Sequence, residues 1–165
     1  MTKPVAFAVA GGLAATALAA LVTSGTHGRG RAESRDGRLG AFQFEVARRS
    51  EGDAAPVYSG RFRFEQIANR RGPAVLIESG KPAALVVTRA GNVCEFSAPA
   101  VLVRQVEGQR VTVPGRIDVR TEDRRSRERP RNEPDKIRVR FRAERGLTFE
   151  FDGLVFDGDL VVFRR

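Results

Sequence analysis

The chain has no tryptophan, one tyrosine, one histidine and one cysteine among its 165 residues. A single cysteine cannot form an internal disulfide, so the folded part must be stabilised by packing and backbone pairing. The one histidine, His27, lies in a polar segment where we expect a linker, so a Ser-His-Asp or Cys-His arrangement has no base, and a zinc site has no histidine and only one thiol. Sugar-binding sites usually present Trp or Tyr faces, so their shortage disfavours carbohydrate binding and glycosidase chemistry.

Negative charge is scarce relative to positive charge, and the formal net charge is +9. Arginine dominates the positive side, since lysine occurs only at Lys3, Lys81 and Lys136. A basic protein favours encounter with anionic partners such as acidic polysaccharides, lipid headgroups or nucleic acid.

Residues 4–22 carry no charge, are rich in Ala, Gly, Val and Leu, and follow Lys3. This pattern predicts an export signal, with small residues suited to cleavage at Ala17-Leu18-Ala19 or at Val22-Thr23-Ser24. The competing interpretation is a membrane anchor, because the run approaches the ~20 residues that a spanning helix needs. Its high Ala content and Gly11-Gly12 weaken that interpretation.

We therefore expect an N-terminal helical signal peptide or anchor over residues 1–24. The protein is then secreted or held in the cell envelope, in the periplasm or on the outer surface, with inner-membrane anchoring as the alternative. Contact with a membrane is expected only through an uncleaved N-terminal segment. Residues 25–39 are polar, Gly-rich and without a hydrophobic period, which predicts a flexible linker that includes His27.

From residue 40 onward, apolar and polar side chains alternate, which is the period of a strand with one buried face. Phe42, Phe44 and Val46 show it first, and Gly-containing turn signals separate the stretches. No window beyond the leader sustains a helical period. We expect an all-β domain over residues 40–165, an antiparallel sandwich or barrel of about eight or nine strands. Its phenylalanines at alternate positions are expected to form the core.

Two of these strands can be placed against each other. If residues 116–122 and 135–144 pair in antiparallel fashion with their apolar sides together, the side-chain alternation restricts the register. One register sets Asp118 opposite Arg140 and Glu122 opposite Lys136, giving two favourable cross-strand charge pairs. A shift of two residues, with Asp118 opposite Arg138, is the alternative.

Several short motifs occur in a fixed order along residues 40–163. They are Gly40-Ala41-Phe42-Gln43-Phe44, the run from Val86 to Gly91-Asn92, Ile117-Asp118-Val119 before Asp123, Pro134-Asp135-Lys136-Ile137, and Gly158-Asp159-Leu160-Val161-Val162. This order resembles the post-COAP type of bacterial secreted domain. The resemblance implies an exported all-β protein. That family has no settled catalytic residues, so the resemblance implies no site residues.

The segment from residue 124 to 131 carries five arginines against Glu128. Guanidinium groups donate in a fork to phosphate, sulfate or carboxylate, so this loop is the candidate contact with an anionic polymer. The alternative is a solvated loop kept soluble by its charge. Nucleic acid is disfavoured, because the loop has no aromatic side chain to stack on bases. The candidate residues are Arg124, Arg125, Arg127, Arg129 and Arg131.

Acidic residues bracket that loop, and Asp123 and Asp135 are weak candidates for a calcium site together with Glu122 and Glu133. Salt bridges to the arginines are the better explanation, because the spacing matches no ligand loop. Cys94 lies in an apolar run, which predicts a small buried side chain; the alternative is a reactive thiol.

We therefore expect that the protein is not an enzyme and that it holds no cofactor and no resident metal. The expected function is a non-catalytic binding module for a protein or an anionic polymer. The alternatives are a structural subunit that pairs through edge strands and, more distantly, a hydrolase that uses carboxylates such as Glu95, Glu150 and Asp152.

Overall fold

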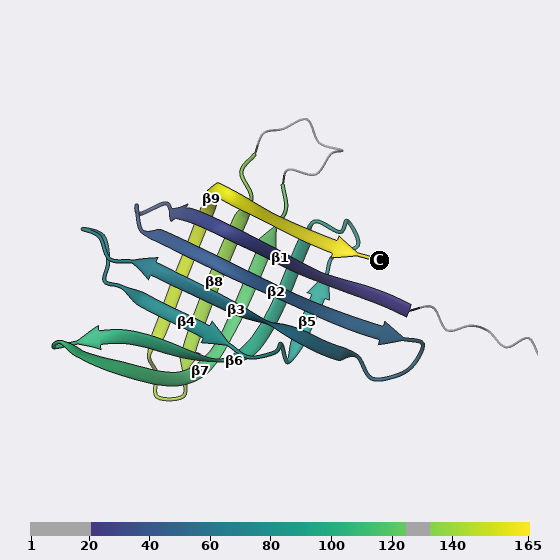
Figure 1. Cartoon of the computed structure of the whole chain (residues 1–165), viewed down its shortest axis with the longest axis horizontal. Coiled ribbons are helices and arrows are strands. Elements are labelled where there is room, and N and C mark those ends of the chain that lie inside the picture. The colour runs from purple at the N-terminus through teal and green to yellow at the C-terminus, as the bar shows by residue number, and fades with distance from the viewer. Residues whose placement is uncertain (1–20, 125–132) are drawn as a thin grey trace, which may run out of the picture.

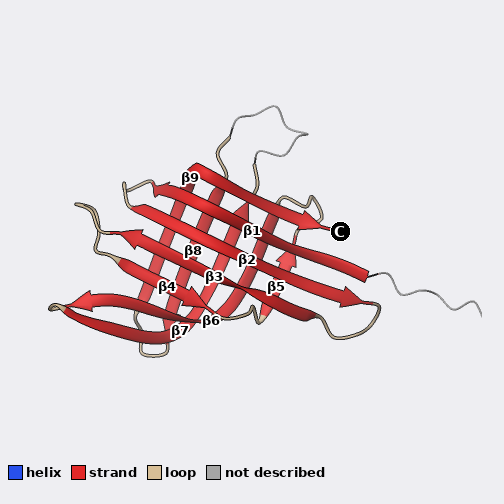
Figure 2. Ribbon diagram, viewed as in Figure 1, coloured by secondary structure: helices blue, strands red, loops and turns tan. Residues whose placement is uncertain are grey.

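The computed structural model describes residues 21–124 and 133–165. These residues form nine antiparallel strands in one sheet, and Figure 2 shows no helix among them. The predicted all-β class is confirmed. No membrane-spanning helix is found in the described part of the chain. The strands are β1 (Leu21–Ser34), β2 (Leu39–Glu51), β3 (Val57–Ile67), β4 (Val75–Ser79), β5 (Ala84–Val87), β6 (Val93–Val106), β7 (Gln109–Glu122), β8 (Lys136–Ala143) and β9 (Thr148–Arg164).

The sheet closes on itself. Its strand order is β4-β3-β2-β1-β9-β8-β7-β6-β5, and β4 also pairs with β6. β4 and β5 follow one another along the same edge of β6, β4 against residues 100–104 and β5 against residues 94–97. They are therefore two halves of one interrupted strand, and the fold is an up-and-down barrel in which β9 returns to β1.

The barrel is flattened into two layers. In Figure 1, β1, β2, β3 and β4 cross steeply over β6, β7 and β8. The long strand β9 belongs to both layers: its first half pairs with β8 and its second half with β1. A register shift opposite Arg31 and Ala32 marks a bulge at Phe156, which is 55% exposed. Such bulges bend a strand and turn it from one layer to the next.

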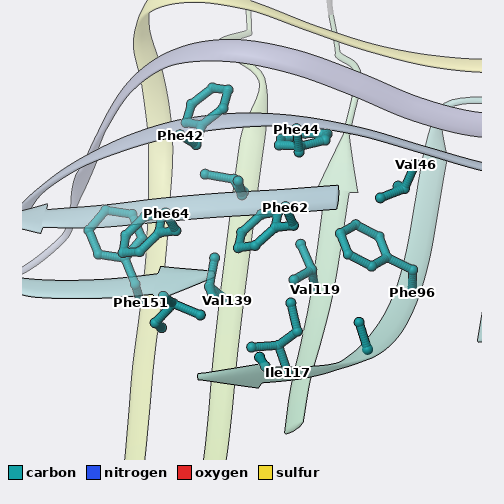
Figure 3. Close-up of a cluster of buried hydrophobic side chains, with 14 of the residues drawn as sticks. Phe42, Phe44, Val46, Phe62, Phe64, Phe96, Ile117, Val119, Val139 and Phe151 are labelled. Carbon is teal, nitrogen blue, oxygen red and sulfur yellow. The ribbon is translucent and has the colours of Figure 1, made fainter. Parts of the chain in front are cut away.

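Phenylalanine rings fill the space between the layers. Figure 3 shows rings from β2 and β3 pointing toward the aliphatic side chains of β7 and β8. Phe64 and Phe151 approach to 4.8 Å between ring centroids, a distance typical of favourable aromatic pairs. The predicted aromatic core is confirmed at the positions Phe42, Phe44, Phe62, Phe64, Phe96, Phe141 and Phe151, all of which are buried.

The predicted register between β7 and β8 is also confirmed. Asp118 lies opposite Arg140, and Glu122 lies opposite Lys136. The ion pairs themselves form with other neighbours, since Arg140 binds Glu150 of β9 at 3.0 Å and Lys136 binds Asp152 at 2.9 Å. Residues 136–142 of β8 each have one cross-strand neighbour on β7 and one on β9, so the acidic residues of β9 compete with those of β7.

The prediction of a flexible linker over residues 25–39 is wrong, because most of this segment belongs to β1. The helical leader was predicted over residues 1–24. Residues 1–20 lie outside the described residues, and residues 21–24 begin β1 instead of ending a helix. β1 lies between β2 and β9 and faces the core with small side chains. A Cβ on Gly28 would lie 2.8 Å from the Asp159 carbonyl oxygen and 3.3 Å from the Phe42 ring. The β9 backbone and the Phe42 ring therefore occupy the space that a side chain at Gly28 would need, and glycine permits this close approach.

Candidate functional site

The predicted polyanion loop lies largely outside the described residues, which include only its first arginine, Arg124. Arg125, Arg127, Arg129 and Arg131 fall within residues 125–132. The Arg124 guanidinium binds Glu122 at 2.7 Å, and its backbone N–H donates to Asp135 at 3.0 Å. The described arginine of this set is therefore held in an ion pair at the end of β7.

The weak metal candidates Asp123 and Asp135 are used in backbone contacts. The Asp135 carboxylate is buried and accepts the Arg124 N–H, and the Asp123 carboxylate accepts the Val162 N–H at 3.5 Å. No group of three or more metal-ligating side chains occurs within residues 21–124 and 133–165. These contacts join the ends of β7, β8 and β9.

The outer face of β6, β7, β8 and β9 is a lattice of ion pairs, in which Arg120 bridges Glu95 at 2.6 Å and Glu122 at 2.9 Å. Burial alone would raise the pKa of Glu122, but hydrogen bonds from Arg124 and Arg120 hold it below its usual value. Asp152 behaves in the same way, because hydrogen bonds from Lys136 and Arg138 outweigh burial and lower its pKa. The carboxylates named for a hydrolase, Glu95, Glu150 and Asp152, all belong to this lattice.

Cys94 is buried inside the barrel, as predicted. Burial, with a smaller contribution from Glu95, raises the pKa of its thiol to about 12. A thiol with this pKa is neutral at physiological pH and is a poor nucleophile.

A pocket of about 380 Å³ opens where the β1–β2, β3–β4 and β8–β9 turns meet. We call this site the arginine pocket. Its volume falls within the range of about 300–1,000 Å³ that is common for small-molecule sites. Its apolar walls come from Val75, Leu102, Leu147 and Phe149, and its cationic side chains are Arg38, Arg71 and Arg104.

Arg38 holds the pocket together. Its guanidinium donates to the Asp36 carboxylate at 2.8 Å, to the Glu150 carbonyl at 2.8 Å and to the buried amide oxygen of Gln66 at 3.3 Å. The Gln66 amide in turn donates to the Pro73 carbonyl at 2.7 Å. A hydrogen bond from Ser34, supported by Arg38, lowers the pKa of Asp36. This network joins the β1–β2 turn, the β3–β4 turn and the start of β9, and it pairs the Arg38 guanidinium with the Asp36 carboxylate.

The other two arginines have no such partners. Neither Arg71 nor Arg104 forms a side-chain hydrogen bond or an ion pair with any described residue, and Arg104 Nε is buried without an acceptor. A buried donor on a charged group costs about 1–3 kcal/mol or more when it lacks an acceptor. Two unpaired guanidinium groups beside an apolar wall form a site complementary to an anion with an apolar part.

A larger hollow, of about 1160 Å³, lies on the outer face of β1, β2 and β3, and we call it the outer hollow. His27 lies here, opposite Glu45 on β2, and its ring is 5.8 Å from that of Phe163. Sequence analysis had predicted this histidine in a linker. Glu78 in the same hollow is held by Arg63 at 2.7 Å.

Sequence analysis missed the arginine pocket because its residues lie on four separate segments. Arg38, Arg71 and Arg104 are far apart in sequence, and Arg104 occupies an inward-facing position at the end of an apolar strand. An arginine in phase with Phe96, Ala98, Ala100 and Leu102 was the available signal.

No family model, no curated protein and no solved structure matches the chain. The resemblance to the post-COAP type of domain therefore stays a prediction.

Proposed function

We propose that the chain is an exported, non-catalytic binding module that takes up an anionic group in the arginine pocket. The observation that carries this proposal is the buried Nε of Arg104, which has no acceptor, beside the unpaired guanidinium of Arg71. A carboxylate, phosphate or sulfate would supply the missing acceptors in forked geometry. The apolar walls favour an anion attached to an aliphatic or aromatic group.

The chemistry of the other candidate sites supports binding rather than catalysis. The Cys94 thiol is buried, with its pKa raised to about 12. The pKa of Asp152 is lowered, against burial, by Lys136 and Arg138, whereas a general acid needs a raised pKa. Secretion or residence in the cell envelope follows from the predicted leader and belongs to the same proposal.

The test uses 1-anilinonaphthalene-8-sulfonate, a fluorescent sulfonate with an apolar ring system. We expect this probe to bind the wild-type chain, and we expect the double variant Arg71→Gln, Arg104→Gln to bind it at least tenfold more weakly, because two charge-assisted contacts are lost. Arg29→Gln is the matched control, since Arg29 is an exposed arginine of the outer hollow. Equal affinity in the double variant and in the control contradicts the proposal.

Competition identifies the form of the anion. Octanoate that displaces the probe indicates a small amphipathic ligand, and a heparin fragment that displaces it indicates the anionic polymer expected from the sequence. Inorganic phosphate alone tests whether charge is sufficient. Displacement by none of the three contradicts anion binding at this pocket.

A second candidate function, assembly through edge strands, is favoured by a different observation. β3 extends beyond its neighbour β4 and leaves part of its edge unpaired within the described structure.

A further inference from the structure

β3 has five residues with a free edge. β2 pairs with β3 along residues 57–67, whereas β4 covers only residues 62–66. Beyond Ser79 the chain leaves β3 through Gly80 and continues as β5 on β6. The outer hollow adjoins this edge, since Ser59, Gly60 and Ser79 are among its lining residues. Space for another strand therefore exists beside residues 57–61.

The hydrogen-bonding pattern shows which backbone groups face this space. The Ser34 N–H donates to the Arg38 carbonyl, so even-numbered residues of β1 and β2 bond to each other. Odd-numbered residues of β2 then bond to odd-numbered residues of β3, because bonding direction alternates along a strand. The N–H and C=O groups of Tyr58 and Gly60 consequently point away from the sheet.

The free edges of β7 and β5 are protected. The edge of β9 after Val155 is also unpaired on its β8 side, and there the Val162 N–H donates to the Asp123 carboxylate at 3.5 Å. β7 is unpaired on its β8 side from Gln109 to Pro114, but Pro114 has no N–H and occupies a position that points outward. β5 has only four residues, and short edge strands resist pairing. Residues 57–61 contain no proline and no lysine, and Val57 is 65% exposed.

We propose that this edge pairs with the same edge of a second copy of the chain, in antiparallel fashion about a two-fold axis at Ser59. In this register Tyr58 of each copy lies opposite Gly60 of the other, and these are the residues whose backbone groups point outward. Four hydrogen bonds form across the axis. The front layers of the two barrels become one continuous sheet, an isologous interface.

The charges along the edge are compatible with this register. Arg61 lies opposite Val57 of the other copy, and Glu45 is its neighbour on β2, so no like charges face each other across the axis. A shift that sets Arg61 opposite Arg61 would place two guanidinium groups together. Gly60 has φ +109°, and a Cβ there would lie 1.9 Å from the Glu45 carbonyl oxygen, so the position admits only glycine. A glycine opposite Tyr58 leaves room for that aromatic ring.

Cysteine cross-linking tests the axis directly. Ser59 would lie opposite Ser59 in a pair without hydrogen bonds, about 4.5 Å apart at Cα, which suits a disulfide. We expect Ser59→Cys to give a covalent dimer on oxidation. Val57→Cys is the matched control, because the two introduced thiols would lie roughly 13 Å apart along the strands. Cross-linking of Val57→Cys as efficient as that of Ser59→Cys, or none by Ser59→Cys, overturns the proposal.

Sedimentation of the full chain gives an independent measurement. Tyr58→Pro removes an outward N–H without removing a bond to β2, and we expect it to raise the dimer dissociation constant at least tenfold. Thr112→Pro makes the same change at the edge of β7 and is expected to dimerise as the wild type does. A wild-type chain that remains a monomer up to about 1 mM overturns the proposal. Probe binding by the arginine pocket is measured separately, so either proposal can fail alone.

Discussion

The ring of Phe64 lies where a side chain on Gly40 would otherwise be. A Cβ built on Gly40 would come within 2.6 Å of Cε2 and Cζ of this ring and 3.0 Å from Cζ of Phe151. Gly40 precedes Phe42, the cross-strand partner of Phe64, by two residues, so the ring covers its diagonal neighbour. The aromatic core therefore depends on glycine at this position.

Gly40→Ala is expected to lower the free energy of unfolding by about 1–3 kcal/mol, because the added methyl group overpacks the core. Gly80→Ala is the matched control, since no atom lies within 4 Å of a Cβ at that position. Its effect is expected to stay within about 0.5 kcal/mol. Denaturant unfolding measures the free energy of unfolding of both variants. If Gly40→Ala is as stable as Gly80→Ala, the rings of Phe64 and Phe151 can move aside without loss of stability.

Thr26 and Thr121 form a polar contact in the barrel interior. The Thr121 hydroxyl is 3.2 Å from the Thr26 hydroxyl, which donates to the Val161 carbonyl at 2.9 Å. Thr26→Val is expected to cost about 1–2 kcal/mol, because it leaves buried polar groups without a partner. A double-mutant cycle with Thr121→Val should show coupling of about 0.5 kcal/mol or more. Thr112→Val, at an exposed position, is the control, and strict additivity of the two core changes would contradict a direct contact.

Stability is expected to fall in acid. The pKa of Asp152 and that of Glu122 are below their ordinary values of 3.8 and 4.5 in the folded chain. The unfolded chain therefore binds these protons first, so the stabilisation is complete above the unfolded pKa and is lost as the pH falls through the lower folded value. The melting temperature should drop from about pH 5 downward.

Asp152→Asn should flatten this acid-side slope, because asparagine does not titrate. Asp53→Asn, in the exposed turn after β2, should keep the wild-type slope. If Asp152→Asn also keeps the wild-type slope, the ion pairs with Lys136 and Arg138 do not contribute to the pH dependence.

The position of β1 predicts where a leader can be removed. Leu21 pairs with Glu51, and Thr23 exchanges two backbone hydrogen bonds with Arg165. Cleavage after Ala19 would leave these contacts intact, whereas cleavage after Ser24 would remove them. We expect N-terminal sequencing of the mature protein to find Ala20. A mature chain that begins at Gly25 contradicts this expectation.

Truncation tests the role of the same strand in folding. Removal of residues 1–20 should leave the melting temperature unchanged, whereas removal of residues 1–30 should abolish cooperative unfolding, because β1 joins β2 to β9. A cooperative transition in the shorter chain would show that β1 is dispensable.

Sequence alternation predicted the strands of the core well where large apolar residues mark the inward face. Between β7 and β8 it also predicted the register, because Ile117 and Phe141 set the parity and the charges selected one of two shifts. The alternation of apolar residues did not predict β1, because the inward side chains of this strand are small. The polar outward residues His27, Arg29, Arg31 and Glu33 did alternate, and this was the available signal.

The candidate sites were harder to predict than the fold. The loop arginines were predicted as a binding site because they are close together in the sequence, yet Arg124 forms an ion pair with Glu122. The arginine pocket depends on turns brought together by closure of the barrel, and no local pattern encodes that closure. The free edge of β3 likewise follows from where the chain departs at Gly80, which strand periodicity does not reveal.

The closure between β1 and β9 also constrains how the chain reaches its native state. Thr26 and Val161, joined by a hydrogen bond, are separated by 135 positions. Contacts of such long sequence separation slow folding, since a large loop must close before they form. The barrel can close only after β9 has been synthesised, so a nascent chain that lacks β9 leaves the β9 edge of β1 unpaired.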